Sequence, residues 1–123
     1  SHMEPKDFEK LFKTNVTANY RLIRAFDPLL RASNDAHVVA VTSSVAETPR
    51  AYWGAYAATK AALGNLVETY GLEVATISKV RTHIYNPGGT ATAMRAKAYP
   101  GEDPATLKTP ETAAAEIAAL LKA

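Results

Sequence analysis

Ala55-Tyr56-Ala57-Ala58-Thr59-Lys60 is the stretch that decides the fold assignment, and its tyrosine stands twelve residues after Ser44. On a helix, Tyr56 and Lys60 would lie one above the other on a single face, about 6 Å apart along the axis. An ammonium held near a phenol favours the phenolate and lowers a pKa that is ordinarily about 10. A tyrosine in that setting can transfer protons at neutral pH, although the Y-x-x-x-K pattern alone is common by chance.

Length and composition are those of one ordinary globular domain. The chain has 123 residues, of which 47% are apolar and 21% charged, and it has no cysteine. We interpret residues 1–3 as a tag remnant, with Met3 as a candidate native start, and residues 4–123 as a single incomplete domain. The lack of cysteine, of a signal-peptide pattern and of a long apolar run predicts a cytoplasmic protein that does not enter the membrane.

Charge and histidine patterns argue against two classes of function. The net charge of +2 comes from 14 basic and 12 acidic residues that are interspersed along the chain. A nucleic-acid-binding protein more often has a clustered basic face with aromatic residues between the charges, so we expect no nucleic-acid partner. His2, His37 and His83 have no ligand spacing, so we expect no metal site.

The first part of the chain predicts one long amphipathic helix. Apolar residues recur from about Pro5 to Ala32 at intervals of three and four, and Pro28 is expected to kink the helix or end it before Ser33. Asn15 is a polar member of the apolar stripe. Its amide needs partners if it is buried, so it either fills a structural gap or faces a polar site.

Two strands and two further helices complete the pattern. Residues 37–42 and 80–86 are short runs rich in β-branched residues, as in strands that are covered on both faces. A helix is expected at 56–75, and another from the cap Thr109 to about Lys122. The predicted fold is α/β, in the order helix-strand-helix-strand-helix, with two parallel strands joined by one right-handed crossover.

Polar or flexible residues follow the carboxyl end of each predicted strand. Ser44 lies just after the first strand, and Pro87-Gly88-Gly89-Thr90 follows the second. Ligands of open α/β sheets bind beyond the carboxyl ends of the strands. A hydroxyl at this edge is therefore well placed for chemistry, although serine is also common in turns.

In order and spacing, the chain resembles the second half of a short-chain dehydrogenase/reductase over essentially its whole length. The resemblance rests on Asn15 in a helix, Ser44 after a strand, Tyr56 and Lys60 at the start of the next helix, and the segment 86–94 after the next strand. The segments 52–56, 93–96 and 99–104 are similar to a bacterial subgroup of the family. This resemblance implies a partial Rossmann-like, doubly wound fold and an oxidoreductase that uses NAD or NADP on a carbonyl or alcohol.

The resemblance also implies roles for individual residues. Tyr56 would be the general acid and base, Lys60 would lower its pKa and bind the nicotinamide ribose, and Ser44 would hold the substrate oxygen. Asn15 would hold a water that links Lys60 to solvent. Tyr56 and Lys60 would thus contact the cofactor, together with Pro87, Gly88, Gly89, Thr90 and Thr92, of which Thr92 would hold the carboxamide. The substrate pocket would be bordered by Ser44, Tyr52, Trp53 and Met94.

One family feature is missing from the sequence. The Gly-rich turn that receives the cofactor pyrophosphate is absent, because none of the six glycines is arranged in that pattern. The strands expected before residue 5 and after the last helix are also missing. We therefore expect the chain alone to bind NADH or NADPH very weakly or not at all, and to be inactive alone.

A second interpretation is that the chain is a non-catalytic, oligomerising remnant of a dehydrogenase. In the family, the helices that correspond to residues 5–32 and 56–75 pair across a two-fold axis as a four-helix bundle. Both are present here, which predicts a homodimer or larger assembly. Strands pairing between chains could cover the open sheet edges.

Overall fold

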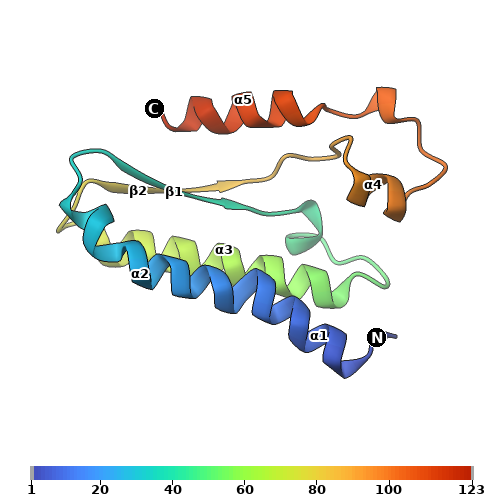
Figure 1. Ribbon diagram of the computed structural model, residues 1–123, viewed down its shortest axis with the longest axis horizontal. Coiled ribbons are helices and arrows are strands. Elements are labelled where there is room, and N and C mark those ends of the chain that lie inside the picture. Colours follow the sequence, from blue (N-terminus) through green and yellow to red (C-terminus); the bar gives the residue numbers. More distant parts are fainter. Residues whose placement is uncertain (1, 123) are drawn as a thin grey trace. The chain divides into compact units, whose positions relative to one another are not determined.

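The computed structural model describes residues 2–122, which form an α/β structure containing two parallel strands (Figure 1). The predicted α/β class is confirmed. Ser1, part of the predicted tag remnant, and Ala123 lie outside the described residues. The chain divides into two compact units, Ser1–Tyr85 and Asn86–Ala123, which are described separately. The single incomplete domain at 4–123 stays a prediction.

The first unit begins with a helical stretch whose predicted bounds are confirmed. It consists of α1 (Pro5–Phe12), a π-helical turn (Lys13–Thr17) and α2 (Ala18–Ala32). α2 continues past Pro28 and ends at Ala32, before the extended Ser33, while a kink at Pro28 stays a prediction. The irregularity lies earlier, where the Ala18 N–H bonds to the Lys13 carbonyl and widens the turn.

The two strands pair along their whole length. β1 (Ala36–Val41) and β2 (Val80–Tyr85) are parallel, with Ala36 opposite Val80 and Val41 opposite Tyr85. Each lies within one residue of its predicted bounds. The Thr42 N–H donates to the Tyr85 carbonyl at 2.8 Å, which extends the pairing beyond β1 and indicates the side of the strand that faces β2.

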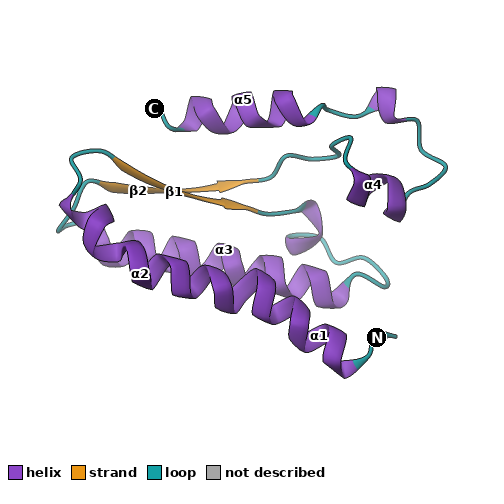
Figure 2. Cartoon of the chain, in the orientation of Figure 1, coloured by secondary structure: helices purple, strands orange, loops and turns teal. Residues whose placement is uncertain are grey.

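α3 (Gly54–Val74) supplies the core of the first unit and, with α2, covers one face of the two strands (Figure 2). Its buried residues recur every three or four positions, as expected for a helix with one face against a sheet. They are Thr59, Leu63, Val67, Tyr70 and Val74. Tyr70 and Val74 pack against Ala36 and Val80 of the strands, and Leu63 and Val67 pack against Ala40. Each large apolar side chain buried here contributes about 1.5–3 kcal/mol to folding.

The second unit contains one predicted helix and one that the sequence reading missed. α5 (Pro110–Leu120) begins as expected, with the Thr109 hydroxyl accepting the Thr112 N–H at 3.1 Å. The predicted order has no helix between the second strand and Thr109, but the segment 91–108 contains α4 (Ala93–Ala98) and a 3-10 turn (Pro104–Thr106). Among the residues from 2 to 122, no helix is long and apolar enough to cross a membrane.

Gly71 is the point of closest approach between α3 and β2. A Cβ at this position would collide with the Oγ1 of Thr82, and it would also lie 3.1 Å from the Thr82 methyl carbon. By contrast, a Cβ at Gly64 on the same helix would meet nothing within 4 Å. The absence of a side chain at Gly71 therefore sets how closely α3 lies on the sheet.

We expect Gly71→Ala to destabilise the chain by about 1–3 kcal/mol, because the added methyl group forces α3 away from β2. Gly64→Ala is the matched control and should stabilise the chain by up to about 1 kcal/mol through helix propensity. Urea unfolding followed by circular dichroism measures both changes. Equal stability of the two variants would contradict the close approach.

Candidate active site

The first turns of α3 position Tyr56 and Lys60 as the sequence predicted. Both side chains are half-buried, and the Lys60 Nζ lies 5.7 Å from the centre of the Tyr56 ring. The ammonium also donates a hydrogen bond to the Val41 carbonyl at 3.1 Å. Lys60 thus links the start of α3 to the carboxyl end of β1.

The expected lowering of the Tyr56 pKa by Lys60 stays a prediction, and in the chain as it stands the shift runs in the opposite direction. Burial raises the pKa of the Tyr56 phenol, and burial lowers the pKa of the Lys60 ammonium. Both shifts follow from desolvation, which disfavours the charged form of each group. The ammonium is directed to Val41, so it does not compensate for the cost of burying a phenolate.

Asn15 lies in the π-helical turn and faces α3. Its amide Nδ2 donates to the Oγ1 of Thr59 at 3.1 Å, and the Thr59 hydroxyl donates to the Tyr56 carbonyl at 2.8 Å. Thr59 has no exposed surface. Asn15 therefore has a structural partner beside the candidate catalytic pair, through a threonine that the sequence reading did not single out.

Ser44 begins a 3-10 turn (Ser44–Ala46) that contacts α3. Its carbonyl accepts the N–H groups of Glu47 and Thr48 at 3.2 and 3.0 Å. The sequence predicted no helix between the first strand and residue 56, and after this short turn the backbone is irregular up to the start of α3 at Gly54. The serine is half-buried after β1, on the same unit as Tyr56 and Lys60.

The two aromatic residues that precede α3 differ in their environments. Trp53 packs edge-on to the Tyr56 ring, with 5.8 Å between the ring centres. Tyr52 is 82% exposed and has a φ of 70°, a backbone conformation that is strained for a bulky residue. Trp53 therefore lies beside the candidate catalytic tyrosine, whereas Tyr52 projects from a strained turn.

The candidate cofactor loop opens the second unit and is held by its own hydrogen bonds. The Gly88 N–H donates to the side chain of Asn86 at 3.0 Å, and the Thr90 hydroxyl donates to the Gly88 carbonyl at 3.2 Å. Gly88 has a φ of 72°, a conformation that glycine adopts without strain. Pro87 and Gly89 flank it, and the loop therefore has a defined backbone shape.

Thr92 and Met94 lie at the start of α4. The Thr92 hydroxyl accepts the Arg95 N–H at 3.1 Å and caps the helix, while Met94 is 63% exposed. A hydroxyl that accepts one hydrogen bond still has its own O–H to donate. Thr92 can therefore cap α4 and bind an acceptor at the same time.

An ion pair closes the segment that follows Thr92. Arg95 binds Glu102 through two parallel hydrogen bonds of 2.8 and 2.9 Å, and its guanidinium lies 4.0 Å from the centre of the Tyr99 ring. The hydrogen bonds to Glu102 raise the pKa of Arg95, and Arg95 lowers the pKa of Glu102. The sequence did not predict this ion pair, because Arg95 and Glu102 lie seven residues apart in a segment for which no helix was expected.

His37 and His83 contact each other across the two strands. The Nδ1 of His37 lies 2.9 Å from the Nε2 of His83, and the Nε2 of His37 lies 3.0 Å from Asp35. Over residues 2–122, no group of three or more histidine, cysteine, aspartate or glutamate side chains could hold a metal ion. The pair therefore serves as a polar contact between β1 and β2.

Two parallel strands joined by a helix, with a tyrosine and a lysine at the start of that helix, define a partial Rossmann-like domain. The family model for short chain dehydrogenases matches residues 1–103. The oxidoreductase YciK of Escherichia coli K12 is 42% identical over 110 residues, which cover 89% of this chain and 43% of that protein. The chain therefore belongs to the short-chain dehydrogenase family.

Two further relatives agree with this assignment. The 2,3-dihydro-2,3-dihydroxybenzoate dehydrogenase of Escherichia coli K12 is 34% identical over 101 residues, which cover 82% of this chain and 40% of that protein. A short chain dehydrogenase of Escherichia coli CFT073, solved in complex with NADPH, is 41% identical with a TM-score of 0.83 over 89% of this chain and 45% of that chain. The chain thus spans less than half the length of these relatives.

We expect the Tyr56 phenol of the isolated chain to ionise above pH 10, since burial raises its pKa above the ordinary value of 10.0. Phenolate absorbance is titrated against pH for the wild type and for Tyr56→Phe. The difference between the two curves reports the ionisation of Tyr56 alone. Lys60→Ala should leave the midpoint nearly unchanged, because Lys60 is held by Val41. A midpoint below pH 10 that rises in Lys60→Ala would show that the ammonium controls the phenol after all.

Proposed function

We propose that this chain carries the proton-transfer residues of an NAD(P)-dependent oxidoreductase that acts on a carbonyl or alcohol substrate in the cytoplasm. The supporting observation is the pairing of Tyr56 and Lys60 on one face of α3, with 5.7 Å between the ammonium and the phenol ring. The family assignment adds weight, because two of the relatives are named as an oxidoreductase and a dehydrogenase.

In the reductive direction, the Tyr56 hydroxyl donates its proton to the substrate oxygen as the carbonyl becomes an alcohol. The nicotinamide, when bound, supplies the hydride that reduces the carbonyl carbon. Ser44 donates a hydrogen bond that orients the substrate oxygen. Lys60 stabilises the resulting tyrosinate once its ammonium turns from Val41 towards the phenol, which would reverse the raised pKa of Tyr56.

Each of the two units, taken by itself, carries residues that suit a part of the nicotinamide end of the cofactor. Lys60 and Tyr56 offer donors for the ribose hydroxyls, and the free O–H of Thr92 suits the carboxamide oxygen. The shaped backbone from Pro87 to Thr92 would lie along the ring. No Gly-rich turn in the 123 residues could hold the pyrophosphate. We therefore expect weak binding by the chain alone, and NADPH is the first nucleotide to test because one similar structure contains it.

Because the chain is expected to be inactive alone at ordinary nucleotide concentrations, the test uses millimolar NADPH, which compensates for weak binding, and a panel of aldehydes, ketones and quinones. Tyr56→Phe should lower the rate by at least about 100-fold, because it removes the proton donor. Tyr20→Phe on α2 is the matched control and should keep the wild-type rate. Nucleotide oxidation is followed by absorbance.

Equal rates for Tyr56→Phe and Tyr20→Phe would show that Tyr56 is not the proton donor. If the wild-type chain shows no turnover with any member of the panel, the result favours the second interpretation, a non-catalytic remnant that assembles through its helices. NADPH fluorescence that saturates at micromolar protein would contradict the expected weak binding.

We also propose that the chain forms a homodimer or larger assembly through helices 5–32 and 56–75. Support comes from large apolar side chains that are exposed on these helices, including Phe8 (44%), Tyr20 (49%) and Leu72 (81%). Exposed apolar side chains of this size commonly mark surfaces that another molecule covers.

Light scattering should therefore give a molar mass of at least twice the 13.2 kDa of one chain. Leu72→Asp should lower that mass towards one chain, because a carboxylate is costly to bury in an apolar interface. Leu121→Asp lies outside both helices and should leave the assembly intact. A wild-type mass of 13.2 kDa would contradict the proposal.

A further inference from the structure

Thr59 is a polar side chain that α3 buries completely between its two candidate catalytic residues. It has no exposed surface, and it follows Tyr56 by three residues and directly precedes Lys60. Valine has nearly the same shape and would fill this site without a polar group that needs partners. The hydroxyl therefore contributes something that packing alone does not require.

The two hydrogen bonds of the Thr59 hydroxyl have a fixed direction. A hydroxyl has one proton to donate, and the Tyr56 carbonyl at 2.8 Å can only accept it. The Thr59 oxygen can then only accept from the side chain of Asn15, which lies at 3.1 Å. The Asn15 amide must therefore present its NH2 group to Thr59, with its oxygen on the other side.

Asn15 is held by two helices. It lies in the π-helical turn, where the Ala18 N–H bonds to the Lys13 carbonyl, and this turn contacts α3. The Asn15 carbonyl accepts a hydrogen bond of 2.8 Å from the side chain of Asn19. The backbone of Asn15 is thus fixed within the first helical stretch, while its side chain is fixed by α3.

The start of α3 depends on such an anchor, because no side chain caps it. The helix begins at Gly54, and no side-chain cap hydrogen bond is made from its N-cap position, Trp53. An uncapped first turn has N–H groups without helical partners, and helix ends of this kind open readily. Tyr56 lies in this first turn, so its position depends on contacts beyond the turn itself.

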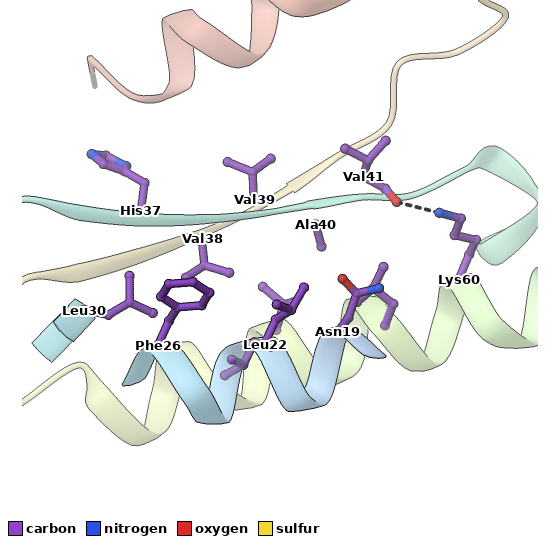
Figure 3. A pocket seen from close by; sticks show the side chains of 13 residues that line it. Asn19, Leu22, Phe26, Leu30, His37, Val38, Val39, Ala40, Val41 and Lys60 are labelled. Atoms are coloured by element: carbon purple, nitrogen blue, oxygen red, sulfur yellow. Dashed lines mark hydrogen bonds between the residues drawn. The ribbon is translucent and has the colours of Figure 1, made fainter. Parts of the chain in front are cut away.

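In the proposed mechanism Lys60 has to move, whereas Tyr56 has to stay. The Lys60 ammonium now donates to the Val41 carbonyl at 3.1 Å, beside a cavity of about 420 Å³ that Asn19 also lines (Figure 3). Lys60 can turn its side chain towards Tyr56 without displacing the phenol only if the backbone between the two residues is held. Thr59 is part of that backbone, and its hydroxyl fastens it at the Tyr56 carbonyl.

We propose that Thr59 is a positioning residue of the candidate active site, whose buried hydroxyl joins the first turn of α3 to the π-helical turn and sets the orientation of the Asn15 amide. It acts through Tyr56 and Asn15 rather than on the reacting atoms. The hydrogen bonds are features of the structure itself, and only their use in proton transfer rests on the proposed function.

Thr59→Val removes the hydroxyl and keeps the shape of the side chain. Without the bond to the Tyr56 carbonyl, we expect the first turn of α3 to open towards solvent. The midpoint of Tyr56 ionisation should then fall towards 10.0, since burial is what raises this pKa. Phenolate titration, with Tyr56→Phe as the reference in each background, measures the midpoint. Thr59→Ser retains the hydroxyl and should retain the wild-type midpoint.

Thr69→Val is the matched control, because it is the same substitution at an exposed position of α3. It should leave the Tyr56 midpoint unchanged. A hydroxyl that only stabilised the core would lower the stability of Thr59→Val without moving the midpoint of the folded molecules. A midpoint that is the same in Thr59→Val and in the wild type would therefore overturn the positioning role.

The orientation of the Asn15 amide is tested in the wild type, without a substitution that could impair folding. By nitrogen-edited NMR, the Nδ2 proton of Asn15 bonded to Thr59 should exchange with water at least tenfold more slowly than those of Asn65, which is exposed on α3. Thr59→Val should remove this protection and Thr59→Ser should keep it. Neither measurement needs cofactor, substrate or turnover, so a failure of the proposed function would leave both results unaffected. Equal exchange at Asn15 and Asn65 in the wild type would overturn the assigned orientation.

Discussion

The first unit depends on the buried face of α3. The chain enters this helix from β1 and leaves it to β2, so one stripe of side chains from Thr59 to Val74 fixes both strands. The same helix carries Tyr56 and Lys60 on its first turns. Packing and chemistry are therefore determined by a single element, whose distance from the sheet is set at Gly71. A change in this packing would therefore move the candidate catalytic residues as well.

The sequence predicts most of this architecture because its signals are local. Short β-branched runs mark both strands, and Thr109 followed by Pro110 marks the start of α5. The π-helical turn at Lys13–Thr17 leaves no such signal, since it depends on which carbonyl each N–H selects. α4 is a six-residue helix in a polar segment, and its only sequence cue is the cap Thr92. Such short elements carry too few residues to show a period.

The sequence likewise predicts one part of the candidate site and leaves another part unpredicted. The i, i+4 relation of Tyr56 and Lys60 follows from helix geometry and could be predicted. The direction in which the Tyr56 pKa shifts could not be predicted. It depends on how deeply the phenol is buried and on the hydrogen bond between Lys60 and the Val41 carbonyl. Thr59 was also missed, since a buried threonine in a helix has no motif. The structure shows that its hydroxyl links Asn15 to the Tyr56 carbonyl. Asn15 and the Tyr56 backbone are thus connected by hydrogen bonds that only tertiary packing creates.

The π-helical turn has a consequence for how the chain tolerates insertion and deletion. An α-helix rotates by about 100° per residue, and the wide π turn takes up one extra residue without adding that rotation between α1 and α2. Both helices contact α3, one on each side of that turn. Deletion of one residue between Lys13 and Thr17 would restore a regular helix of nearly the same length. It would also leave α1 facing nearly its present partners, whereas the deletion of a residue from the regular part of α2 would turn the preceding segment by about 100°.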